Sequence, residues 1–172
     1  SLSKNSSLKP TILRFATAFG LSSRMRYDLT VNEFTRDIFY SKKLEVYDPD
    51  TWRPYCHVKD FANILLLILD AEKKKISFEV FNAGSDNNNH TKRMIVEKVL
   101  KFVNFNEVYY VNNKGSDPRN YRVNFHKLNS VLGYQCKYLV DDGIKEILAH
   151  LEISNEDSFK SNKPLGNYTI RI

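Results

Sequence analysis

Short apolar segments of strand composition alternate with helical stretches along this 172-residue chain, and this alternation limits its possible folds more than any other feature. Four segments are apolar and β-prone: 11–18, 44–47, 78–82 and 107–111. Five have helical periodicity or helix caps: 28–42, 58–72, 91–103, a short one that ends at Gly133 and one from Asp141 or Asp142 to Leu151. The order predicts a mixed α/β fold with an incomplete sheet, because these strands are too few for a complete doubly wound sheet.

Apolar positions within the helical stretches predict which faces are buried. Residues 58–72 are apolar nearly all round, so this helix is expected to be largely buried, with Asp60 as a cap. The helix after Thr91 is expected to take that residue as its N-cap and to turn Ile95, Val99 and Phe102 inward.

Charge and cysteine content narrow the class of protein. A net charge of +6 favours anionic partners without choosing among nucleic acid, phosphates and acidic lipids. Two cysteines without CxxC spacing exclude a disulfide framework and make a reducing, cytoplasmic location the default. No apolar run approaches the roughly 18 residues of a membrane span. The histidines lack metal-ligand spacing, and neither a Walker loop nor Gly-x-Gly-x-x-Gly occurs.

The strongest candidate for chemistry is the segment from Arg53 to Asp60, Arg-Pro-Tyr-Cys-His-Val-Lys-Asp. An arginine fixed in a short loop after a strand can fork onto a diphosphate, and a helix N-terminus attracts anions. The alternative is an ordinary loop with a surface arginine, in which His57 makes a structural hydrogen bond.

Two further arginine pairs are candidates for anion contacts. Arg119 and Arg122 lie in a polar segment and could complete an anion clamp opposite Arg53, or belong to a solvated charged loop. Arg24 and Arg26 could meet phosphate or pair with the nearby Asp28.

Several of these motifs occur together and in a fixed order. They are Ile12-Leu-Arg14-Phe-Ala-Thr17-Ala-Phe-Gly20, Arg53-Pro-x-x-His57-Val-x-Asp60, Phe81-Asn82-Ala-Gly84, and Asp117-Pro-Arg119-Asn-Tyr-Arg122 with Lys127 and Leu132-Gly133. Over residues 10–150 the chain resembles the C-terminal half of an extended short-chain dehydrogenase/reductase. More narrowly, it resembles the NAD-dependent nucleotide-sugar epimerases and dehydratases. Asn124 stands where the family pattern usually has Asp.

The resemblance implies a role for individual residues. Segment 11–18 would be a late strand of a Rossmann-type sheet, and most of the rest a small mixed α/β substrate-binding domain. Arg53 and Arg119 would hold the diphosphate of a nucleotide sugar, with Arg122 as a further cation. Thr17 would face the sugar, Asn32 would lie near the diphosphate, and the strand that ends at Tyr47 would line the nucleobase. His57 and Asp60 look architectural.

The family's Gly-rich NAD loop and its Tyr-x-x-x-Lys catalytic pair are not found in these residues. The chain is therefore expected to bind a nucleotide sugar without turning it over alone. NAD(P) and the catalytic groups would come from an N-terminal half. A stand-alone, non-catalytic nucleotide-sugar-binding subunit or relic remains an alternative, and a basic nucleic-acid-binding domain a remote one. We assign no catalytic residue, cofactor-binding residue or metal ligand, and a homodimer stays open.

Three regions are expected: a flexible lead-in over 1–9, the substrate-binding region over 10–151, and a polar, partly disordered tail over 152–172. The chain begins with Ser rather than Met, which suggests a piece of a longer protein.

Overall fold

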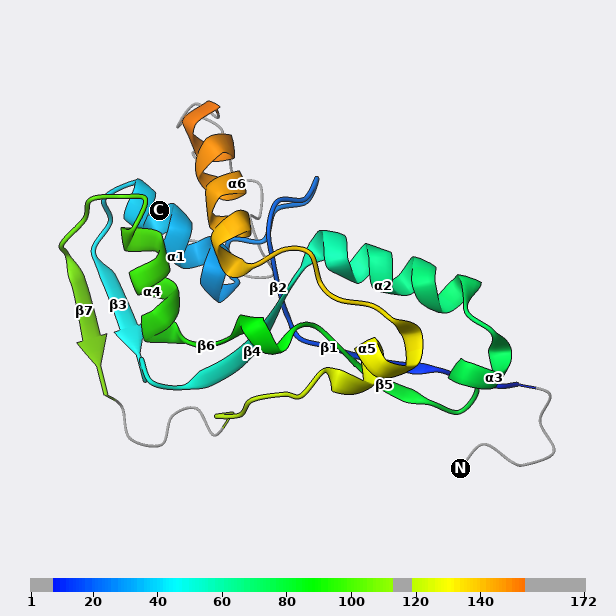
Figure 1. Ribbon diagram of the computed structural model, residues 1–172. Helices are drawn as coiled ribbons and strands as arrows, with labels where there is room; N and C mark the ends of the chain where they lie inside the picture. Colours follow the sequence, from blue (N-terminus) through cyan, green and yellow to red (C-terminus); the bar gives the residue numbers. More distant parts are fainter. Residues whose placement is uncertain (1–7, 113–118, 154–172) are drawn as a thin grey trace.

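The computed structural model describes residues 8–112 and 119–153. The predicted lead-in and tail lie outside these ranges, apart from two residues of each. In Figure 1 strands β2 and β4 cross the middle of the molecule. Helices α1, α4 and α6 and strands β3 and β7 lie on one side of them, and α2, α3, α5, β1 and β5 on the other.

The predicted strand over 11–18 is present, divided into two short strands. β1 (Ile12–Phe15) pairs in parallel with β5 (Val80–Ala83). β2 (Thr17–Phe19) pairs in parallel with β4 (Trp52–His57). The chain changes partner at Ala16, whose N–H still donates to the carbonyl of Ala83 at 3.1 Å. One run of apolar residues thus joins two sheets.

Strand β4 corrects the prediction that Arg53 lies in a loop. It is the central strand of a three-stranded sheet, parallel to β2 and antiparallel to β6 (Asn89–Thr91), which was also not predicted. Pro54 lacks an N–H and is unusual in a central strand, and β6 is polar and only three residues long. In a third sheet, β3 (Leu44–Tyr47) pairs in parallel with β7 (Val108–Val111). Both strands were predicted.

The five predicted helices begin and end close to the predicted positions, whereas α3 and the 3-10 turn η1 were not predicted. The helices are α1 (Thr30–Phe39), α2 (Val58–Asp70), α3 (Lys73–Ile76), α4 (Lys92–Leu100), α5 (His126–Leu132) and α6 (Val140–Ile153), with a 3-10 turn η1 (Asp86–Asn88). Thr91 is confirmed as a cap, since its hydroxyl accepts from the N–H of Met94 at 3.2 Å. Gly133 ends α5 with a φ of +67°.

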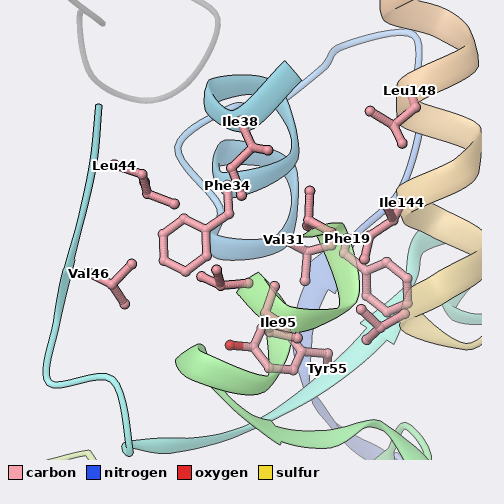
Figure 2. Close-up of a cluster of buried hydrophobic side chains, with 13 residues drawn as sticks. Phe19, Val31, Phe34, Ile38, Leu44, Val46, Tyr55, Ile95, Ile144 and Leu148 are labelled. Atoms are coloured by element: carbon pink, nitrogen blue, oxygen red, sulfur yellow. The ribbon is translucent and has the colours of Figure 1, made fainter. Parts of the chain in front are cut away.

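The first core cluster lies between α1, α4, α6 and the strands β2–β4 (Figure 2). Its buried members are Phe19, Val31, Phe34, Ile38, Leu44, Val46, Tyr55, Ile95, Val96, Val99, Val140, Ile144 and Leu148. Ile95 and Val99 are buried as predicted. Phe102 is not: it lies beyond the end of α4 and is 41% exposed.

The second core cluster joins β1, β4, β5, α2 and α5. Its buried members are Cys56, Ile64, Phe81, Ala83 and Leu128. The prediction that α2 is largely buried is wrong, because Leu65, Leu66 and Leu69 are 46%, 60% and 79% exposed. An all-apolar run carries no polar stripe to show which side faces the core. Within the described residues, no helix has the length and apolar character needed to cross a membrane.

Candidate functional site

Residues 119–122 lie against the start of β4, although 66 residues separate Arg53 from Arg119 in the sequence. The N–H of Trp52 donates to the side-chain oxygen of Asn120 at 3.0 Å. The N–H of Tyr121 donates in turn to the carbonyl of Trp52 at 3.3 Å. These two bonds fix the segment on the strand, and they bring the arginines of both segments to one place.

The start of β4 and residues 119–122 each place an arginine over an aromatic ring of the other. We call these two contacts the arginine–aromatic pair. The guanidinium of Arg53 lies 5.5 Å from the ring centre of Tyr121. The guanidinium of Arg122 lies 4.5 Å from that of Trp52. Arg53 is 9% exposed, and its Nη1 donates to the carbonyl of Trp52 at 3.0 Å. A guanidinium near an aromatic ring is attracted by the electron-rich face of that ring, so these two contacts help to hold the arginine side chains in place.

A cavity of about 400 Å³ opens beside this pair, and we call it the strand-end cavity. It lies at the carboxyl ends of the parallel strands β1 and β5, where ligands of open α/β sheets commonly bind. The residues around it are Arg14, Phe15, Ala16, Pro54, Asn82, Tyr121, Arg122, Val123, Asn124 and Phe125. Two arginines, two amides and a tyrosine suit a ligand that carries negative charge and several hydroxyl groups.

Sequence reasoning did not single out Arg14, Asn82 or Tyr121 as site residues, yet all three border the strand-end cavity. Arg14 and Asn82 are directly opposite each other in the β1–β5 register. In the sequence, each of them is a polar side chain within a short, mostly apolar strand, and this could have marked it as a candidate. Only the pairing of the strands shows that the two side chains share a location.

Thr17 and Asn32, two other predicted substrate residues, are not among the residues that border this cavity. Thr17 follows the cavity residue Ala16 and pairs with Tyr55 of β4. Asn32 is buried, where its Oδ1 accepts from the N–H of Gly20 at 3.1 Å and its Nδ2 donates to the carbonyl of Arg26 at 3.0 Å. It therefore shapes the turn after β2.

The remaining predicted side chains are exposed. Tyr47, at the end of β3, donates its hydroxyl to Glu45 at 2.9 Å and is 48% exposed. Arg119 is exposed beside Asn120, the residue that binds the backbone of β4. Arg26 pairs with Asp28 at 2.7 Å, which favours the structural alternative for this arginine over a phosphate contact.

Asp60 does not cap α2 as predicted. His57 is the cap, since its Nδ1 accepts from the N–H of Lys59 at 3.1 Å. Asp60 is fully buried and instead accepts from the Tyr134 hydroxyl at 2.8 Å and from the N–H groups of Lys137 and Tyr138 at 3.0 and 3.1 Å. It holds the segment between α5 and α6 against α2.

His57 is buried between β2, β4 and α6 and has both ring nitrogens occupied. Burial lowers its pKa, against the opposing effect of Glu146, whose Oε2 lies 2.9 Å from Nε2. Because Nδ1 already accepts from Lys59, the hydrogen-bond pattern assigns the ring proton to Nε2, which donates to Glu146. Glu146 also accepts from Lys59 Nζ and from the N–H of Leu21 at 3.1 Å. The arrangement is architectural.

The described residues hold no group of three or more His, Cys, Asp or Glu side chains placed to bind a metal ion. A dinucleotide pocket of the Rossmann type needs a Gly-rich turn between a strand and a helix. The 172 residues contain no Gly-x-Gly-x-x-Gly sequence.

Comparison with known proteins identifies a family and similar folds. Residues 1–84 match the model of the NAD dependent epimerase/dehydratase family. The chain is similar in structure to a UDP-glucose 4-epimerase from Thermotoga maritima solved with UDP-glucose, with 22% identity over 87% of this chain and a TM-score of 0.73. It is similar to a dTDP-glucose 4,6-dehydratase from Bacillus anthracis solved with NAD, with 26% identity over 89% of this chain and a TM-score of 0.70.

A UDP-glucuronic acid 4-epimerase from Bacillus cereus, solved with UDP-glucuronic acid and NAD, is 20% identical over 87% of this chain, with a TM-score of 0.70. The chain spans about half the length of these structures: 48%, 46% and 47% of them. The predicted fold class, mixed α/β with an incomplete sheet and similar to part of Rossmann-type structures, is thereby confirmed.

Proposed function

We infer that this chain, a member of the NAD-dependent epimerase/dehydratase family, supplies the nucleotide-sugar-binding portion of such an enzyme. The observation that carries the proposal is the arginine–aromatic pair, of which Tyr121 and Arg122 border the strand-end cavity and Arg53 contacts Tyr121 from outside the cavity lining. A diphosphate needs convergent guanidinium groups, and a sugar needs amides and an aromatic wall. The similar structures solved with UDP-glucose and UDP-glucuronic acid support this class of ligand.

The chain's own residues would bind and orient the substrate. Arg53, Arg119 and Arg122 would contact the diphosphate, and Asn82 the hydroxyls of the sugar. Thr17 and Tyr47 would face the sugar and the nucleobase respectively. Asn32, whose amide group is bonded to Gly20 and Arg26, would act on the diphosphate region through the turn that it holds.

NAD, when bound by the complete enzyme, supplies the hydride acceptor for this family's chemistry. We assign no catalytic residue to this chain and propose that a cofactor-binding half provides those groups. Cytoplasmic location and homodimer formation are part of the same proposal.

Calorimetric titration with UDP-glucose and dTDP-glucose tests the proposal. The Arg122→Ala variant removes an exposed cation at the cavity, so the chain should remain folded while affinity falls tenfold or more, which is about 1.4 kcal/mol. Arg53→Lys keeps the charge of the buried arginine but loses its planar fork, and should weaken binding in the same direction.

Lys74→Ala is the matched control, because Lys74 is an exposed cation on α3, remote from the cavity. It should leave the affinity unchanged. Equal affinity of wild-type and Arg122→Ala chains would overturn the assignment of the cavity, as would absence of binding by the wild-type chain. DNA or RNA binding that falls steeply with salt would favour the nucleic-acid alternative instead.

A further inference from the structure

The two cysteines of the chain come from distant parts of the sequence and meet in the second core cluster. Cys56 is the next-to-last residue of β4 and is fully buried. Cys136 lies between α5 and α6 and packs against the cluster that contains Cys56. Both are free cysteines; Cys56 Sγ donates to the His57 carbonyl at 3.7 Å, and the Cys136 side chain is near enough to act on the ionisation of the Cys56 thiol. The fold therefore brings the two cysteines together in one cluster.

The segment that carries Cys136 is firmly held. Asp60 of α2 accepts three hydrogen bonds from residues on both sides of this cysteine: one from Tyr134 and one each from the backbone of Lys137 and Tyr138. Helix α2 begins two residues after Cys56. The same carboxylate thus fixes the backbone around both cysteines, and the closeness of the two cysteines belongs to the fold.

Only one of the two thiols faces open space. Cys136 borders a cavity of about 450 Å³, which we call the thiol cavity, together with His126, Asn129, Tyr134 and other residues of η1 and α5. Cys56 has no exposed surface. A small oxidant can therefore reach Cys136 and not Cys56. Cys136 would be oxidised first, and Cys56 could react only with the oxidised Cys136.

We propose that Cys136 and Cys56 form a site of reversible oxidative modification, in which a hydroperoxide oxidises Cys136 and Cys56 then closes an intramolecular disulfide. The Cys136 sulfur, as thiolate, attacks the peroxide. The O–O bond breaks, the sulfur becomes the sulfenic acid, and the leaving oxygen takes up a proton, as water from hydrogen peroxide or as an alcohol from an organic hydroperoxide. The Cys56 sulfur then attacks the sulfenyl sulfur. An S–S bond forms, the S–O bond breaks, and the hydroxyl leaves as water with the proton that Cys56 gives up.

Electrostatics agrees with this order of events. The hydrogen bond to Cys136 and burial both raise the pKa of the Cys56 thiol well above its ordinary value. Cys56 is therefore held as the thiol, which is a poor nucleophile for the first attack. Its Sγ also donates to the carbonyl of His57 at 3.7 Å.

Treatment of the purified chain with hydrogen peroxide, followed by intact mass and thiol titration, tests the site. The mass should fall by that of two hydrogen atoms, both thiols should disappear, and dithiothreitol should restore them. A peptide digest should contain Cys56 linked to Cys136 within one monomer. None of these readouts depends on the binding of a nucleotide sugar, so this test and that of the proposed function can fail separately.

Two single variants separate the roles. With Cys136→Ser, the Cys56 thiol should survive the same treatment, because it has no route to the oxidant. With Cys56→Ala, Cys136 should stop at the sulfenic acid, which dimedone captures. Thermal melting checks that each variant is folded. Both thiols surviving in the wild-type chain, disulfides formed only between molecules, or equal loss of Cys56 in Cys136→Ser would overturn the proposal.

Discussion

Gly20 follows β2 in a backbone conformation that only glycine adopts without strain. Its φ is +102°, and a Cβ at this position would lie 2.2 Å from Nε2 of His57. The N–H of Gly20 also donates to Asn32. A missing side chain here allows the turn after β2 to pass directly over a buried imidazole, which fixes the path of the chain between its first two elements and α1.

Replacement of Gly20 by Ala should therefore destabilise the protein by about 2–4 kcal/mol, through the left-handed backbone and the overlap with His57 together. Urea unfolding followed by circular dichroism measures the change. Gly133→Ala is the control. Its φ is +67°, but nothing lies within 4 Å of the new Cβ, so about 1–2 kcal/mol is expected. Equal losses in the two variants would mean that the contact with His57 does not matter.

Helix α2 carries a buried carboxylate, that of Asp60, which accepts hydrogen bonds from three donors. Asp60→Asn replaces an acceptor oxygen by an amide group that must face these donors, so at least one hydrogen bond is lost in a buried place. We expect a loss of about 2–4 kcal/mol in the free energy of unfolding. Asp70→Asn, at the exposed end of the same helix, should change it by less than about 0.5 kcal/mol. A similar effect of both would contradict the role given to Asp60.

The helices and strands also show how much of the fold can be predicted from the sequence. Local signals were sufficient for the Thr91 cap and for Gly133, because each depends on neighbours in the chain. Strand β3 was found from its β-prone composition, although its pairing with β7 joins distant segments. Strand β4 was missed because its pairing with β2 and β6 outweighs the poor strand propensity of Pro54. The arginines were found as residues, but their meeting with Trp52 and Tyr121 depends on contacts between distant segments.

At the scale of the whole molecule, several titratable groups favour unfolding in acid. Burial and the nearby Lys98 lower the pKa of His90 to about 4, against Asp141. Burial lowers the pKa of His57. Burial acts to raise the pKa of Glu146, but its bonds from Lys59, Leu21 and His57 outweigh this and lower it. Each group binds fewer protons in the folded chain than in the unfolded chain, so stability falls as the pH falls.

The effect of His90 should be complete above pH 6.5 and should be lost as the pH falls from there to about 4. The unfolded-to-folded ratio should rise by about one to two powers of ten across this window. Urea unfolding at several pH values measures it. His90→Gln should flatten the dependence between pH 6.5 and 4, whereas Gln at the exposed His126 should not. An unchanged slope in His90→Gln would refute the assignment.

Strand β4 connects the two core clusters through adjacent residues: Tyr55 packs in the first cluster and Cys56 in the second. Successive side chains of a strand point to opposite sides, so one short segment is indispensable to both. Melting of either cluster would remove the packing from one face of β4. The two core clusters are therefore expected to unfold together, and a substitution that destabilises one cluster should also destabilise the other.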